Sequence, residues 1–196
     1  PDRLVAEFRL DRVNKNPVVL DTGKLNFINR QYLRESSNTL SLVQELLGKE
    51  GKLPEAGQNE WVRTVIDTLI GGVDVVNELP AALDSALEFP IEEVGDLLDV
   101  VKDSGAVELI RLFGKELNGH AHLTFEDFRK IVSKLKHATG RKGRQLFYPL
   151  RIALTGRSSG PELDKLIPLL EMASRLGVPG VLGCRERIEE FVSRYG

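Results

Sequence analysis

The sequence has a single cysteine, Cys184, among its 196 residues. One cysteine cannot form an internal disulfide bond, so we expect a protein of the reducing cytoplasm. The chain also lacks any run of about eighteen apolar residues, which excludes a membrane-spanning helix. Its first ten residues, PDRLVAEFRL, lack an initial methionine and the charged, apolar and small-residue regions of a secretory signal. The chain is therefore expected to be part of a longer protein.

A convincing set of catalytic residues is also lacking. His120 and His122 offer two ligands to a metal ion, whereas a zinc site uses about three or four protein ligands. The loops at 140–143 and 156–160 contain glycine but lack the Gly-Lys-Ser/Thr ending with which a phosphate-binding loop holds a triphosphate. The serines of the second loop are not in the Gly-x-Ser-x-Gly context of a nucleophile. We therefore predict no catalytic residue and no metal site.

The charged residues are unevenly distributed, although the net charge is only −2. The stretch Leu83–Glu116 is rich in acidic residues, whereas Phe128–Arg157 contains none. The basic residues of the second stretch are Arg129, Lys130, Lys134, Lys136, Arg141, Lys142, Arg144, Arg151 and Arg157. Such asymmetry indicates a surface that binds a polyanion. The alternative is that these charges only solvate a helix face.

Apolar residues recur every three to four positions along most of the chain, which predicts an all-α protein of short helices. Asp21 or Thr22 can cap one helix, and Thr124 can cap another that ends at Gly140. Only residues 13–20 indicate an extended segment or short strand, because a residue that precedes proline avoids the α-helical region.

Two stretches resemble the glutamyl-tRNA synthetase family. Residues 8–34, FRLDRVNKNPVVLDTGKLNFINRQYLR, contain the family's Arg-Val, Lys-x-Pro, Lys-Leu and Asn-x-x-Tyr-x-Arg elements, with Phe27 in place of its tryptophan. Residues 142–163, KGRQLFYPLRIALTGRSSGPEL, are similar to its late signature, Lys-Gly-x-x-Leu-Phe-x-Pro-Leu-Arg-x-Ala-Leu-Thr-Gly followed by Gly-Pro-x-Leu. Between them, the chain resembles the family in helix order and in Asn-Glu-Leu-Pro at 77–80.

The resemblance implies an all-α fold in which multi-helix anticodon-binding bundles, a helical cage, follow a small helical stem-contact region. It implies a stem-contact region at 1–52, a first anticodon-binding helical subdomain at 53–139 and a second one at 140–196.

The implied function is tRNA binding and anticodon recognition as the C-terminal part of a glutamate–tRNA ligase, in protein biosynthesis. The expected partners are tRNA-Glu, with tRNA-Gln as an alternative, and the catalytic domain of the same parent chain. The parent enzyme uses ATP and Mg²⁺. Its nucleotide-handling signatures, His-x-Gly-His and Lys-Met-Ser-Lys-Ser, are absent from this sequence. We therefore expect no cofactor and no catalysis in this chain, and a monomeric state.

Phosphates and 2′-hydroxyls of a folded RNA are bound by basic and small polar side chains. The expected tRNA-binding residues are Lys24, Arg30, Arg34, Lys142, Arg144, Arg151, Thr155 and Arg157. Tyr148 is a candidate for stacking on an anticodon base. Many family members have an arginine that reads the last anticodon base, and a gapless count back from Pro80 places it in the segment Gly71-Gly72-Val73-Asp74, where Gly72 is the candidate. A missing guanidinium predicts relaxed discrimination between tRNA-Glu and tRNA-Gln.

Two other functions stay open. A stand-alone helical adaptor, or a protein-interaction module derived from the same fold, would not need the acid-free basic stretch. A small hydrolase would need a pocket that joins His120 or His122 to a carboxylate.

Overall fold

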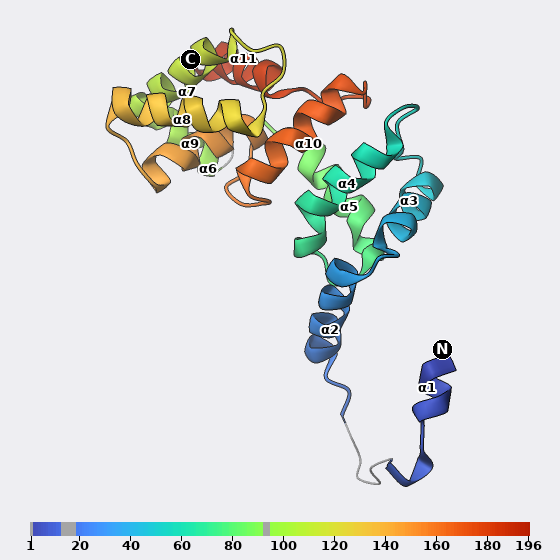
Figure 1. Cartoon of the computed structure of the whole chain (residues 1–196). Coiled ribbons are helices and arrows are strands. Elements are labelled where there is room, and N and C mark those ends of the chain that lie inside the picture. Colours follow the sequence, from blue (N-terminus) through green and yellow to red (C-terminus); the bar gives the residue numbers. More distant parts are fainter. Residues whose placement is uncertain (1, 13–18, 92–94) are drawn as a thin grey trace.

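The computed structural model describes residues 2–12, 19–91 and 95–196, and helix is the only regular secondary structure in these ranges (Figure 1). The predicted all-α class is therefore confirmed. Of the extended segment predicted at 13–20, residues 13–18 lie outside the described ranges. The α-helices are α1 (Asp2–Glu7), α2 (Thr22–Glu35), α3 (Thr39–Lys49), α4 (Gln58–Leu69), α5 (Leu79–Leu87), α6 (Asp96–Lys102), α7 (Ser104–Leu117), α8 (Phe125–Thr139), α9 (Arg144–Thr155), α10 (Leu163–Arg175) and α11 (Cys184–Tyr195). The short 3-10 helices are η1 (Leu10–Arg12), η2 (Ile70–Gly72) and η3 (Val76–Glu78).

The capping residues begin and end helices where the sequence predicts. The Asp21 carboxylate accepts a hydrogen bond from the Lys24 backbone N–H at 3.0 Å, so Asp21 is the N-cap of α2. The Thr124 hydroxyl accepts from the Asp127 backbone N–H at 3.1 Å and starts α8. Gly140 ends α8 in the left-handed region, with a φ of 69°, which glycine adopts without a Cβ clash.

Helices α3, α4 and α5 form a first bundle around the indole of Trp61. This side chain is 1% exposed, and its Nε1–H donates to the Lys52 carbonyl at 3.0 Å. The indole therefore ties the loop before α4 to the core while its only donor stays satisfied. Val43, Leu47 and Leu83 complete this part of the core.

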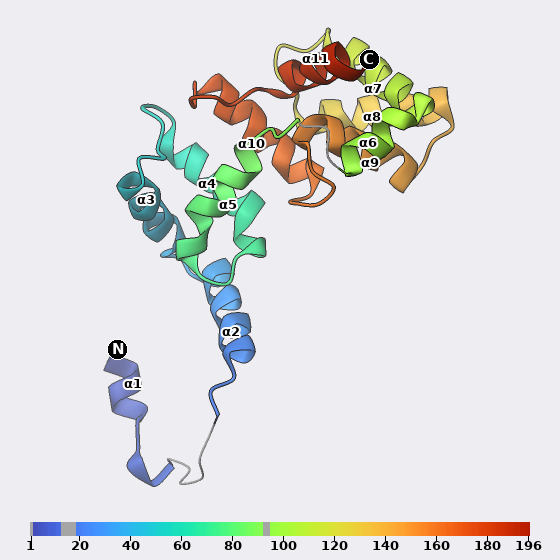
Figure 2. The same cartoon turned by 180° about the vertical axis from the view of Figure 1, so that it is seen from behind.

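Helices α6, α7, α8, α9 and α11 form a second bundle. The rings of Phe113 on α7 and Phe128 on α8 meet edge to face, with centroids 6.0 Å apart. Helix α10 packs on α4 and α5 as well as on α8 and α11, and Figures 1 and 2 both show it between the two bundles. The predicted subdomain boundary at 139–140 falls between α8 and α9. Helix α8 packs on α7 and α10, and helix α9 packs on α7 and α11. The three-part division of the chain stays a prediction.

A buried arginine also joins the bundles. The guanidinium of Arg187 on α11 donates from Nε to the Leu182 carbonyl at 2.8 Å and from Nη1 to the Leu154 carbonyl at 3.0 Å. It also donates to the carbonyls of Leu87 and Glu88, at the end of α5. The positive charge therefore lies at the carbonyl ends of α5 and α9, where helix dipoles favour a cation. Burial lowers the pKa of Arg187 to about 10, so it stays protonated at neutral pH.

Helix α2 projects from the first bundle (Figures 1 and 2). Leu33 is its buried residue, whereas Leu25, Ile28 and Tyr32 are 52%, 55% and 65% exposed. These three side chains share one face of the helix, because their spacing matches the helical repeat. Helix α2 therefore presents an apolar stripe to solvent. Within the described ranges, no helix is both long enough and apolar enough to cross a membrane.

Candidate nucleic-acid interface

A cavity of about 560 Å³, here called the central cavity, lies where α2, the end of α4, η2, α5, α9 and the start of α10 meet. It brings together residues from both ends of the sequence, since Arg34, Gly72, Arg151, Thr155 and Arg157 all line it. Sequence reasoning missed other lining groups, among them Ser159 and Lys165.

The predicted residues of α2 differ in their surroundings. Arg34 donates from Nη2 to the Gly71 carbonyl at 3.3 Å and is exposed at the edge of the central cavity. Arg30 does not line this cavity; its Nε lies 2.9 Å from Oδ1 of Asp74. Lys24 is exposed near the start of the helix and lies outside the cavity lining.

Arg151 lines the central cavity and, together with Glu162, also lines a second cavity beside α9 that is described below. Its Nη2 donates to the Pro161 carbonyl at 2.9 Å, so the guanidinium holds the loop that follows α9. Partial burial lowers the pKa of Arg151. Among the described residues, its Nη1 is buried without a hydrogen-bond partner. A half-buried cation with an unused donor favours an anionic or carbonyl oxygen nearby.

Thr155 and Arg157 shape the loop at the end of α9. The Thr155 hydroxyl is buried, lies 2.8 Å from the Arg151 carbonyl and accepts from the Arg157 backbone N–H at 3.1 Å. It is engaged within the loop and does not present a free hydroxyl to the cavity. The Arg157 guanidinium pairs with Glu88 at 2.6 Å on the surface. Gly156 has a φ of 66°, and an added Cβ would lie 2.2 Å from the Pro90 carbonyl oxygen, so only glycine fits there.

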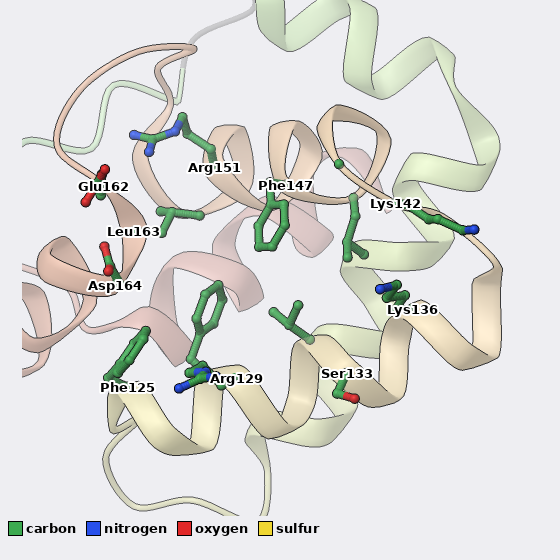
Figure 3. Close-up of a pocket in the computed structure, with 14 residues that line it drawn as sticks. Phe125, Arg129, Ser133, Lys136, Lys142, Phe147, Arg151, Glu162, Leu163 and Asp164 are labelled. Carbon is green, nitrogen blue, oxygen red and sulfur yellow. The ribbon is translucent and has the colours of Figure 1, made fainter.

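A second cavity of about 570 Å³, here called the α8–α9 cavity, lies between α8, α9 and the start of α10 (Figure 3). Phe147 points from α9 toward α8, and it is 43% exposed. Phe125 and Arg129 face it from α8, with the guanidinium of Arg129 5.6 Å from the centroid of the Phe125 ring. Lys136 and Lys142 lie toward the opposite end of the cavity from Arg151 in this view.

Four cations, Arg129, Lys136, Lys142 and Arg151, line the α8–α9 cavity against two carboxylates, Glu162 and Asp164. With its apolar lining, this excess of positive charge suits a flat aromatic ligand that carries negative charge. The sequence holds a signal for this cavity that our site prediction did not use. Phe125, Arg129, Val132 and Lys136 repeat at helical spacing and therefore share one face of α8.

Tyr148 and Arg144 lie on α9 and contact each other. Tyr148 is half-buried and packs on the core, and the Arg144 guanidinium lies 5.0 Å from its ring centroid. One face of this ring is therefore covered by an arginine side chain, whereas the neighbouring Phe147 lines the α8–α9 cavity.

Three cations of the basic stretch form pairs with the acidic stretch. Lys134 pairs with Glu116 at 2.6 Å, Arg157 pairs with Glu88, and Arg141 binds both carboxylate oxygens of Asp103 at 2.9–3.0 Å. The hydrogen bonds from Arg141 lower the pKa of Asp103. The basic residues of this stretch that are exposed and take no part in these three pairs are Arg129, Lys130, Lys136, Lys142 and Arg144.

The histidines form two separate pairs. Nδ1 of His120 lies 3.6 Å from Asp127, and Nδ1 of His122 lies 3.6 Å from Glu171. Neither histidine lines the central cavity or the α8–α9 cavity. Among the described residues, no group of three or more His, Cys, Asp or Glu side chains is placed to hold a metal ion.

This chain matches a known domain family and resembles several known proteins. The family model described as the anticodon binding domain matches residues 35–176. Glutamate–tRNA ligase 2 of Caldanaerobacter subterraneus subsp. tengcongensis is 30% identical over 176 residues, which cover 86% of this chain and 36% of the relative. The glutamate–tRNA ligase of Natranaerobius thermophilus is 32% identical over 177 residues and is covered to the same 36%.

Solved structures agree in fold. The crystal structure of a glutamate tRNA ligase from Elizabethkingia meningosepticum, in complex with its amino acid, superposes over 100% of this chain and 37% of that one, with a TM-score of 0.75 at 17% identity. The chain thus spans little more than a third of the length of the relatives it matches. This chain belongs to the anticodon-binding domain family and corresponds to the C-terminal portion of glutamate–tRNA ligases.

Proposed function

We propose that this chain binds tRNA and reads its anticodon as the C-terminal part of a glutamate–tRNA ligase. The observation that carries the proposal is the central cavity, because Arg34, Gly72 and Arg151 come from distant parts of the sequence and line one space. Positive groups gathered around a concave surface attract the phosphates of an RNA loop, and the unstacked bases of that loop enter adjacent pockets.

The α8–α9 cavity supports the same proposal. Its aromatic side chains Phe125 and Phe147 offer surfaces on which a base can stack, and Arg129, Lys136 and Lys142 offer charges for the backbone. Arg151 lines both cavities, so a loop that crosses from one to the other passes this guanidinium.

The proposal includes a stem-contact region at 1–52, with the anticodon-binding subdomains at 53–139 and 140–196. It also includes the catalytic domain of a parent chain as partner, in a cytoplasmic monomer. The ATP and Mg²⁺ that the ligation needs belong to that domain. The exposed apolar stripe of Leu25, Ile28 and Tyr32 supports this partner, since contiguous apolar surface marks a protein contact.

The proposal is tested by tRNA retention on filters at low and moderate salt. The affinity of a tRNA binder should fall steeply as salt rises, because binding releases condensed cations from the RNA and this release is less favourable at high salt. Lys142→Ala and Arg144→Ala remove exposed charges and should each weaken binding by severalfold, whereas the exposed Lys115→Ala on α7, within the acidic stretch, should not. Weak retention by the unaltered chain at every salt concentration would favour the adaptor function instead.

Relaxed discrimination between tRNA-Glu and tRNA-Gln is the finer part of the proposal. It predicts similar affinities for the two tRNAs, because Gly72 has no guanidinium. An added Cβ at Gly72 meets nothing within 4 Å, so a side chain can begin there without a clash at its first atom. Gly72→Arg should separate the two affinities by about tenfold, as expected for one base-specific arginine contact of about 1–3 kcal/mol. A strong preference for tRNA-Glu in the unaltered chain would contradict this part alone.

A further inference from the structure

The polar face of α2 binds the segment 71–75, which precedes η3. Asn26 donates from Nδ2 to Oδ2 of Asp74 at 2.8 Å, and Asn29 donates from Nδ2 to the Asp74 carbonyl. Arg30 pairs with the other carboxylate oxygen of Asp74 at 2.9 Å. The carboxylate and the backbone carbonyl of Asp74 therefore bind three side chains of the same helix. We call Asn26, Asn29, Arg30 and Asp74 the α2 clamp.

The helical repeat explains why these residues act together. Positions 26, 29 and 30 share one face of α2 with Leu33 and Arg34. Leu33 is 5% exposed, so this face is the one that packs on the first bundle. Leu33 thus supplies the apolar contact, while the polar residues determine where the segment 71–75 lies along the helix.

Asp74 is also held from its other side. Its backbone N–H donates to Oε2 of Glu78 at 2.8 Å, and the Val75 N–H approaches the same oxygen at 3.5 Å. The segment is therefore bound between α2 and the start of α5, with Gly71 and Gly72 next to this anchor. A diglycine has little conformational preference of its own, so neighbouring contacts must fix its backbone.

The clamp lies beside the proposed reading site without forming its wall. Gly71 and Gly72 line the central cavity, whereas Asn26, Asn29 and Arg30 do not. These three residues can therefore influence a ligand in the cavity only indirectly, through Asp74 and the backbone between Gly72 and Asp74.

We propose that the α2 clamp is a set of positioning residues that fixes the backbone at Gly72 in the central cavity and couples α2 to anticodon discrimination. This inference rests on the proposed function and deepens it. Arg30 acts here through its ion pair with Asp74, whereas the sequence predicts it as a direct tRNA contact.

The test uses the full chain and the variants Asn29→Ala, Asp74→Ala and Asp74→Asn. Gln31→Ala is the control, because Gln31 is an exposed residue of the same helix that the clamp does not use. The rate of backbone hydrogen exchange in the segment 70–78, followed by mass spectrometry in the absence of RNA, measures how firmly the clamp holds this segment. Affinities for a tRNA-Glu transcript, and for the same transcript with all its anticodon bases changed, report discrimination.

Asn29→Ala should raise exchange in this segment about fivefold, as expected for the loss of one hydrogen bond of about 1 kcal/mol. Asp74→Ala should raise it further. Asp74→Asn keeps an oxygen that accepts from Asn26 but loses the ion pair with Arg30, so its effect should lie between those of Asn29→Ala and Asp74→Ala. The same order should appear in the loss of anticodon preference, with the affinity for the changed transcript nearly constant.

Unchanged exchange in all three variants would overturn the clamp. Faster exchange with unchanged discrimination would overturn its coupling to reading. Equal loss of affinity for both transcripts would likewise overturn it, because a direct phosphate contact acts without regard to sequence. If the unaltered chain binds neither transcript, the proposed function fails, and the exchange data still decide whether the clamp exists.

Discussion

Arg187→Met should be the most damaging single substitution of a polar residue in the second bundle. Methionine keeps the long apolar stem but removes the donors that reach the carbonyls of Leu87, Glu88, Leu154 and Leu182. Arg187 is 0% exposed, so water does not readily replace the guanidinium. Each buried carbonyl that loses its partner costs about 1–3 kcal/mol.

The net loss is smaller than the sum of these costs, because the variant no longer desolvates a charge. We expect the free energy of unfolding to fall by about 3–5 kcal/mol, in the range seen when one partner of a buried charged contact is removed. For a chain of this size, the melting temperature should fall by roughly 10 °C. Arg187→Lys keeps the charge but has a single nitrogen, so it should lose an intermediate amount.

Urea unfolding followed by far-UV circular dichroism measures the change. The matched control is Arg194→Met on the same helix, since Arg194 is exposed and pairs with Glu190 at 2.5 Å on the surface. Exposed pairs contribute about 0–1 kcal/mol. The reasoning would be refuted if Arg187→Met were as stable as Arg194→Met, because the inter-bundle carbonyls would then not depend on the guanidinium.

Two further predictions concern loops that border the basic stretch. Gly156→Ala should destabilise the chain by more than about 2 kcal/mol, because the methyl group meets the Pro90 carbonyl in addition to the strain of the left-handed backbone. Gly140→Ala has nearly the same backbone angles, with a φ of 69°, and nothing within 4 Å of its Cβ, so it should show the strain alone, about 1–2 kcal/mol by thermal unfolding. If the two variants had the same melting temperature, the steric explanation would be wrong. Asp103 has a pKa lowered by Arg141, so its ion pair stabilises the folded state above the ordinary carboxyl pKa of about 3.9 and is lost as pH falls through the lower folded value. Asp103→Asn should therefore flatten the loss of stability below about pH 4, modestly because the pair is partly exposed, and an unchanged acid profile would count against this pair.

The helical class and many helix ends follow from local sequence. Asp21, Thr124 and Gly140 act through contacts within a few residues of themselves, so their roles can be recognised before the tertiary structure is known. The buried state of Cys184 has a similar origin, because a small apolar side chain at the start of an amphipathic helix faces the core. Burial raises the pKa of its thiol.

The sequence also contains the two segments that carry the family resemblance, but it does not show that they meet. Arg34 and Arg151 share the central cavity only because α2 and α9 are brought to the same place by the packing of α4 and α10. Lys165 is a cation of the central cavity that sequence reasoning left out, because it belongs to no recognisable motif. Arg129 is recognised from the sequence only as part of the basic stretch and not as a site residue.

Tertiary structure likewise decides what each charge does. Arg30, Arg141 and Arg157 look alike in sequence, yet each pairs with a carboxylate that lies 38 to 69 positions away along the chain. Helix periodicity arises from local backbone geometry, so the spacing of apolar residues in the sequence is enough to recognise it. Which cation is neutralised and which one borders a cavity depends on distances between remote segments, and these exist only after the bundles have packed.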